Sequence, residues 1–179
     1  MLAGKDVSPY IRSNQRELLN GSDMEQSIDI RPAVRRQPAH PSIDSAQISA
    51  LVDTFYGRIR EDDRLGPVFD RRLDGRWEPH LGKMKAFWRT VLLKTGEYKG
   101  QPVPTHSKLK EVVSEDYRIW LELFRETAFE VFKDEAAARI VIRQAEKIAQ
   151  SLWMATIASP FNKVPGFLTT DDTQAQSTT

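Results

Sequence analysis

Three histidines are the side chains of this sequence best suited to hold a metal ion. The chain has 179 residues, no cysteine and only His40, His80 and His106 as histidines. Without cysteine there is no thiolate nucleophile, no cysteine-bound zinc or iron–sulfur cluster, and no disulfide. A metal would therefore bind to histidine, methionine or oxygen. His40 lies in the proline-rich segment PAHPS, which we interpret as a linker.

The other two histidines, His80 and His106, are expected to face an apolar pocket. His80 shares the apolar stripe of a predicted helix with Met84 and Phe87, and His106 follows a loop rich in glycine and proline. Each histidine alone is typical of a satisfied core residue. Two that point inward from consecutive segments would suit a flat macrocycle with one iron. A five-coordinate haem iron needs one neutral imidazole and a dry cavity, and His106 suits the first requirement.

Three side chains on apolar helix faces carry O–H or N–H groups that could donate hydrogen bonds to a small ligand bound to such an iron. They belong to Tyr56, His80 and Trp120. A diatomic ligand that gains partial negative charge would be stabilised by about 1–3 kcal/mol per donor, or roughly five- to 150-fold in affinity. Each residue could instead be core packing, which is the commoner role for a tryptophan such as Trp120.

A helical body must position these side chains. Asp44 and Gln47 predict a capping pair ahead of a first helix with apolar residues at three- and four-residue steps. The turn-prone run Glu61–Pro67 should end this helix and deliver Phe69. A second helix is predicted over residues 77–93.

The second half of the body is also predicted to be helical. A loop over residues 95–105 presents His106 at its exit. A third helix should follow an N-cap at Ser114, and a fourth should begin near Asp134 and stop at Pro160. No useful run alternates in strand fashion and no repeat is visible, so the predicted fold class is all-α with about four main helices.

The two ends of the chain are predicted to be flexible. We assign residues 1–41 to an N-terminal extension, residues 42–163 to the folded domain and residues 164–179 to a solvated tail. The extension lacks a secretory or transit pattern, and no run of 18 apolar residues exists. The expectation is a cytoplasmic protein without a membrane partner.

Composition and motifs exclude several function classes. The formal net charge is +1, so no global field attracts nucleic acid, and no nucleic-acid partner is expected. The sequence has no GxGxxG, P-loop, GxSxG, HExxH or EF-hand pattern. Its carboxylates fall on polar helix faces, which argues against a hydrolytic acid–base pair.

The order of four segments resembles that of a known family. These segments are FYGRIREDDRLGPVF, EPHLGKMKAFW, LLKTGEYKGQPVPTHSKL and YRIWLELFRETAFEVF. Over about residues 44–160 the chain resembles a group III truncated haemoglobin, one of the two-over-two helical globins. Like members of this group, the chain has no Gly–Gly pair, and it carries both His80 and Trp120. The resemblance implies a two-over-two helical sandwich that encloses haem b, which is iron protoporphyrin IX.

The resemblance also implies a role for each candidate residue. His106 matches the proximal iron ligand, while Tyr56, His80 and Trp120 match the residues that stabilise a ligand on the distal side. Further residues are expected to bind the cofactor, by lining the pocket or by reaching a propionate: Phe69, Lys83, Met84, Phe87 and Tyr98.

The implied function is reversible binding of dioxygen, nitric oxide or carbon monoxide. Three donors around dioxygen would slow its release, which favours peroxidase-like or nitric oxide-processing chemistry supported by an unidentified reductase. Two alternatives stay open. His80 could also bind the iron, giving a six-coordinate electron carrier or sensor, or the chain could be a helical interaction module without haem.

Overall fold

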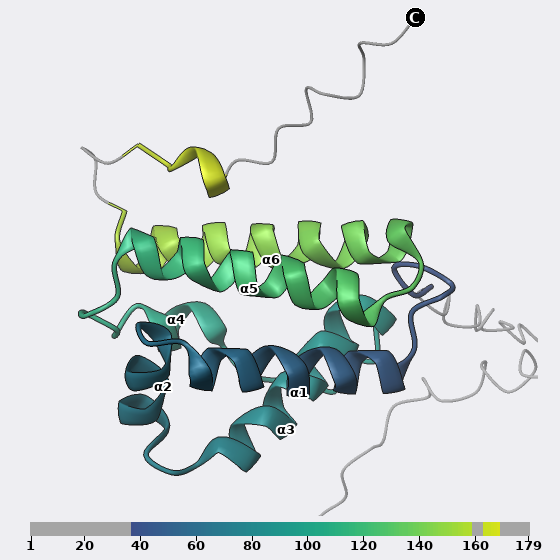
Figure 1. Ribbon diagram of the computed structural model, residues 1–179, viewed down its shortest axis with the longest axis horizontal. Coiled ribbons are helices and arrows are strands. Elements are labelled where there is room, and N and C mark those ends of the chain that lie inside the picture. Colours follow the sequence, from purple (N-terminus) through teal and green to yellow (C-terminus); the bar gives the residue numbers. More distant parts are fainter. Residues whose placement is uncertain (1–36, 159–162, 169–179) are drawn as a thin grey trace, which may run out of the picture. The chain divides into compact units, whose positions relative to one another are not determined.

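Helices make up most of the described chain. The computed structural model describes residues 37–158 and 163–168. No strand occurs in these two ranges, which agrees with the predicted all-α class. Figure 1 shows the elements in chain order: α1 (Ser45–Glu61), α2 (Leu65–Leu73), α3 (Trp77–Leu93), α4 (Pro102–His106), α5 (Ser114–Val131), α6 (Glu135–Thr156) and the 3-10 turn η1 (Gly166–Leu168).

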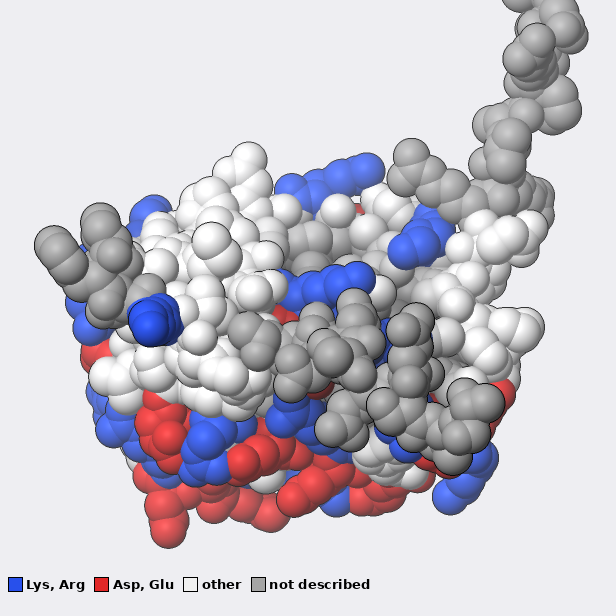
Figure 2. Space-filling view, turned by 90° about the horizontal axis from the view of Figure 1, so that it is seen from above, with Lys and Arg blue, Asp and Glu red and all other residues white. Residues whose placement is uncertain are grey.

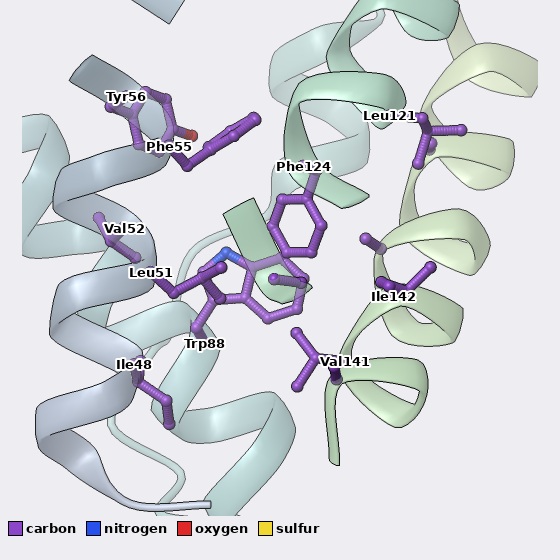
Figure 3. Close-up of a cluster of buried hydrophobic side chains, with 14 of the residues drawn as sticks. Ile48, Leu51, Val52, Phe55, Tyr56, Trp88, Leu121, Phe124, Val141 and Ile142 are labelled. Carbon is purple, nitrogen blue, oxygen red and sulfur yellow. The ribbon is translucent and has the colours of Figure 1, made fainter. Parts of the chain in front are cut away.

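The long helices pack in two pairs across one apolar core. α5 and α6 lie side by side, and α1 packs against both α5 and α3 (Figure 1). Each long helix turns an apolar stripe inward, which removes that surface from water. Phe55, Trp88, Phe124 and Val141 meet at the centre of this core (Figure 3). This is the two-over-two arrangement that the family resemblance implies.

Side-chain caps begin two of these helices where the sequence predicts. The Asp44 carboxylate accepts the Gln47 backbone N–H at 2.8 Å, and the Gln47 side chain accepts the Asp44 N–H at 3.0 Å. The Asp134 carboxylate accepts the N–H groups of Ala136 and Ala137 at 2.9 and 3.3 Å. These bonds satisfy N–H groups that have no partner within the helix, so α1 and α6 start at defined residues.

The cap of α6 gives a stability prediction. We expect Asp134→Ala to lower the free energy of unfolding by about 1 kcal/mol, because two helix N–H groups and the Ser42 hydroxyl lose their acceptor. Urea denaturation of the full chain measures this change. The matched control is Glu135→Ala, which removes only an exposed pair with Arg139 that is worth a few tenths of a kcal/mol. Equal losses in the two variants would contradict a stabilising cap.

The segment around Phe69 is a helix, although the sequence predicts a turn over Glu61–Pro67. The break between α1 and α2 is confined to residues 62–64. The Asp62 carboxylate accepts the first backbone N–H of α2 at 2.7 Å. Pro67 is the third residue of this helix, where the missing N–H costs no intrahelical bond.

His106 lies in a short helix, although the sequence predicts a loop over residues 95–105. α4 takes up the last part of that loop and ends at His106. Its two prolines, Pro102 and Pro104, are its first and third residues. A proline in the first helical turn is tolerated, so these prolines start a helix here instead of preventing one.

The predicted N-cap role of Ser114 is wrong. Ser114 is the first residue of α5, and Val113 holds the cap position. The Asp116 carboxylate accepts the Val113 N–H at 2.9 Å. The Ser114 hydroxyl instead accepts a hydrogen bond from the Trp153 indole at 2.8 Å, which ties the start of α5 to α6.

Part of the predicted solvated tail packs on the helical body. Leu168 is 2% exposed and belongs to the core, and η1 contacts α6. Arg125 donates to the Phe167 carbonyl at 3.5 Å. A solvated tail from residue 164 is therefore wrong for residues 164–168. Residues 169–179, like residues 1–36 of the predicted extension and Pro160, lie outside the described residues.

Charges of both signs share the surface. Figure 2 shows basic and acidic side chains intermixed along one edge of the visible face, and a larger uncharged area beside them. Along α5, Arg118 pairs with both Glu115 and Glu122. In the described part of the chain, no helix is both long and apolar enough to cross a membrane.

Candidate functional site

A cavity of about 400 Å³ opens among α2, α3, α4, α5 and α6. This volume falls in the range of about 300–1,000 Å³ that is usual for ligand sites. Most of its lining is apolar. Four predicted site residues come together on its walls: Phe69, His80, His106 and Trp120.

His106 is oriented by its own helix. Its Nδ1 lies 2.7 Å from the carbonyl oxygen of Pro102, one turn earlier in α4. A carbonyl can only accept, so Nδ1 carries the proton and donates. The lone pair of the neutral ring is then on Nε2, which has no hydrogen-bond partner among the described residues. This arrangement prepares His106 Nε2 to bind a metal.

On another wall of the cavity, a ring nitrogen of His80 has no hydrogen-bond partner among the described residues. This nitrogen, Nε2, is buried. Burial, with smaller contributions from the nearby charges of His106 and Lys83, lowers the pKa of His80 to about 4. The ring is therefore neutral at pH 7. Because buried polar atoms normally have a partner, this nitrogen indicates a ligand or solvent molecule in the cavity.

The lowered pKa of His80 predicts a pH-dependent stability of the chain without a bound ligand. An unfolded histidine with a pKa near 6.5 binds a proton that folded His80 takes up only near pH 4. Stability should therefore fall as the pH drops through this window. We expect a loss of about 1 kcal/mol between pH 7 and 5, discounted for the partial exposure of the ring.

Urea denaturation at both pH values, on the parent and on His80→Gln, measures this contribution. The variant keeps a polar side chain of similar size but has no proton to gain. It should therefore show the smaller loss of stability. An equal loss in both proteins would mean that His80 is not the group responsible.

Tyr56 lies behind the cavity wall, in contact with two of its residues. The Tyr56 ring centroid is 5.1 Å from that of His80 and 5.9 Å from that of Phe69, with edge contacts in both cases. Burial raises the pKa of the Tyr56 phenol, so the hydroxyl stays protonated and can donate. No described residue accepts its hydrogen bond.

Four other predicted cofactor-binding residues do not line the cavity. Lys83 is exposed on α3, and Met84 and Phe87 are half-buried against the core. Tyr98 packs its ring against Phe87, with centroids 5.1 Å apart. Direct contact between these four residues and a cofactor stays a prediction.

Two cationic side chains that the sequence analysis did not identify line the cavity. Arg72 of α2 and Lys108 reach its wall. Arg72 also pairs with Glu111, and this hydrogen bond lowers the pKa of the Glu111 carboxyl to about 2. Position 72 lies three residues after Phe69, on the same face of α2, so the helix period would have revealed it had α2 been predicted.

An ion pair between exposed Arg64 and buried Asp116 connects the start of α2 to the start of α5 beside the cavity. The Arg64 guanidinium donates to both oxygens of Asp116, at 2.6 and 3.1 Å, and Asp116 is 4% exposed. Its carboxylate is an exception to the expectation that carboxylates fall on solvated helix faces.

Known proteins resemble both the sequence and the fold. No protein-family model matches the chain. The chain is 34% identical over 111 residues to the group 3 truncated haemoglobin ctb of Campylobacter jejuni, a match that covers 60% of this chain and 87% of that protein. A crystal structure of the group III truncated haemoglobin from the same organism superposes with a TM-score of 0.59 and 33% identity, over 63% of this chain and 91% of that one.

Proposed function

Because the chain belongs to the group 3 truncated haemoglobin family, we propose that it holds haem b between His80 and His106 and binds small diatomic ligands there. The observation that carries this proposal is His106, whose Nδ1–H is held by the Pro102 carbonyl while Nε2 is left free at an apolar cavity. Dioxygen, nitric oxide and carbon monoxide are the ligands proposed.

Both the apolar walls of the cavity and the polar groups on them suit this cofactor. His106 would bind the iron, and Arg72 and Lys108 would pair with the propionates. Lys83 is a less suitable partner because it does not reach the cavity wall. Bound haem would supply an iron with one open coordination position, at which dioxygen gains partial negative charge.

Distal donors support redox chemistry more than simple delivery. The buried Tyr56 hydroxyl stays protonated, His80 Nε2 has no hydrogen-bond partner among the described residues, and Trp120 lines the cavity. Groups of this kind would hold dioxygen tightly and polarise a peroxide or nitric oxide. We therefore extend the proposal to peroxide or nitric oxide processing, with electrons from a reductase that is not identified.

A second candidate function is supported by the same unpartnered nitrogen. If His80 Nε2 bound the iron opposite His106, the protein would be a six-coordinate electron carrier or sensor. The two candidates differ in whether a ligand can enter without displacing a histidine.

Absorption spectra of the purified full chain in ferric, ferrous and carbon monoxide forms test the proposal. A Soret band with a ligand-free ferrous form of five-coordinate type supports an open iron site. Sharp low-spin bands in that form would support coordination by His80. A colourless preparation that takes up no added haemin contradicts both, and it would favour a haem-free interaction module.

A further inference from the structure

A continuous chain of aromatic rings leads from the cavity to the surface. It begins at Trp120 on the cavity wall, which stacks on Phe124 with ring centroids 5.3 Å apart and planes 14° apart. Phe124 stacks in turn on Trp88, at 5.0 Å and 27° (Figure 3). The contacts continue to Phe87 at 5.5 Å and to Tyr98 at 5.1 Å. We call these five residues the aromatic chain.

We propose that the aromatic chain carries single electrons from Tyr98 to haem held in the cavity while a hydroperoxide is reduced there. Tyr98 would be the point at which small phenolic one-electron donors reach the protein. The inference rests on the proposed function, because it requires haem in the cavity. It adds a class of reducing substrate and an entry site outside the cavity.

The order of the rings suits stepwise electron transfer. Electron tunnelling weakens steeply with distance, so rings in contact transfer charge far better than one long jump. Trp120, Trp88 and Tyr98 can each lose an electron to a strong oxidant. The phenylalanine rings between them fill the gaps as bridges. Trp88 is 3% exposed, so an electron deficiency there is shielded from water until it reaches Tyr98.

The surface end of the aromatic chain can release a proton and meet a donor. Tyr98 is half-buried in a stretch whose neighbours Glu97 and Lys99 are exposed. A phenol that loses an electron also loses its proton, so the proposal requires that water reaches the Tyr98 hydroxyl. The backbone N–H of Tyr98 donates to the Thr90 hydroxyl at 2.9 Å, which holds this residue against α3.

A second aromatic route from the site lacks such an exit. Tyr56 contacts Trp77 with centroids 6.4 Å apart, and the Arg60 guanidinium lies 5.0 Å above the Trp77 ring. Positive charge over a ring opposes the loss of an electron from it. The Trp77 indole N–H donates to Asp70, and the residue is only 8% exposed, so a soluble donor has little access.

The reaction balances with two donor molecules for each hydroperoxide. The O–O bond of ROOH breaks as it accepts two electrons and two protons, and the products are ROH and water. For each electron that the hydroperoxide accepts, the Tyr98 phenol loses one electron and one proton. A soluble phenol ArOH then returns a hydrogen atom to the tyrosyl radical, so that the sum is ROOH + 2 ArOH → ROH + H₂O + 2 ArO•.

Radical trapping on the haem-loaded full chain tests the inference directly. The protein is mixed with hydrogen peroxide and a nitroso spin trap without a reducing phenol, and the adduct is located by peptide mass spectrometry. We expect the adduct on Tyr98. Tyr98→Phe should lose it, and at equal haem occupancy the same variant should oxidise a soluble phenol with a lower kcat/KM than the parent.

Two further variants test whether the electron path through the aromatic chain is needed, and not only the presence of a tyrosine at position 98. In Gly100→Ala the new Cβ would overlap the Tyr98 phenol, so the packing of the Tyr98 ring must change although the tyrosine is kept. Phe87→Leu removes a bridge, and Phe129→Leu is its matched control at an exposed ring outside the aromatic chain. We expect loss of the Tyr98 adduct in the first two variants and an unchanged adduct in the third.

Other outcomes overturn the inference in distinguishable ways. A normal Soret band with the adduct on Tyr10, Tyr56 or Tyr117, or with no tyrosine adduct, would overturn the aromatic chain and leave the proposed function in place. An unchanged adduct in both Gly100→Ala and Phe87→Leu would do the same. Failure to take up haem would overturn the proposed function and this inference together.

Discussion

Replacing His106 with glycine is expected to abolish most haem binding by the full chain. His106 supplies the free Nε2 at the cavity, and the Pro102 carbonyl at 2.7 Å fixes the orientation of its ring. Without this nitrogen the iron would lose its proposed protein ligand, and only apolar contacts and the proposed propionate pairs would remain. Haemin titration, followed by the Soret band, measures the loss. Free imidazole should restore the band, because His106→Gly leaves room for it beside α4.

The thermal stability of the same variant gives a second readout. A cofactor that binds only the folded state raises stability by RT ln(1 + [L]/Kd). With haem supplied, the Tm of His106→Gly should therefore drop to near that of the haem-free parent. His40→Ala is the matched control, because His40 bonds to Ser42 away from the cavity. Loss of the spectrum in His40→Ala but not in His106→Gly would show that the proposed ligand is wrong.

The long helices could be predicted from the sequence because their signals are local. Apolar residues at three- and four-residue steps mark the buried faces, and polar caps mark two of the starts. α3 occupies Trp77–Leu93 as predicted, and α1 begins directly after its predicted cap residue, Asp44. Such patterns depend on neighbouring residues, so no knowledge of tertiary contacts is needed.

The two short helices could not be predicted, because the meaning of proline depends on where a helix starts. Pro67 and the two prolines of α4 lie in first helical turns, where proline is tolerated, but in a sequence they resemble breaks. This ambiguity also hid part of the site. With the start of α2 interpreted as part of a turn, nothing placed Arg72 on the same face as Phe69.

The sequence predicted which types of residue form the candidate site better than it predicted which of them line the cavity. His80, Met84 and Phe87 share one stripe of α3, yet only His80 reaches the cavity. A stripe identifies the apolar face of a helix, but it does not say which part of that face meets the core and which part meets a ligand. Only the packing of α3 against α1 separates the two.

Replacing Tyr56 with phenylalanine is expected to speed the release of dioxygen about five- to 150-fold. This range corresponds to the loss of one hydrogen bond worth about 1–3 kcal/mol. The change removes only the hydroxyl, whose pKa is raised by burial so that it stays a donor. The ring contacts with Phe55 and His80 are kept, so the cavity wall should hold its shape. Stopped-flow measurement of dioxygen release from the ferrous protein gives the rate.

The control for Tyr56→Phe removes a hydroxyl that already has a partner. The Tyr117 hydroxyl is 2.9 Å from that of Thr156, so Tyr117→Phe should leave the release of dioxygen unchanged. Carbon monoxide gains less negative charge than dioxygen when it binds iron, so its release should change less in Tyr56→Phe. Faster loss of both gases to the same extent would indicate a wider opening of the cavity. Release of dioxygen no faster than from the parent would remove Tyr56 from the distal site and leave His80 and Trp120 as its donors.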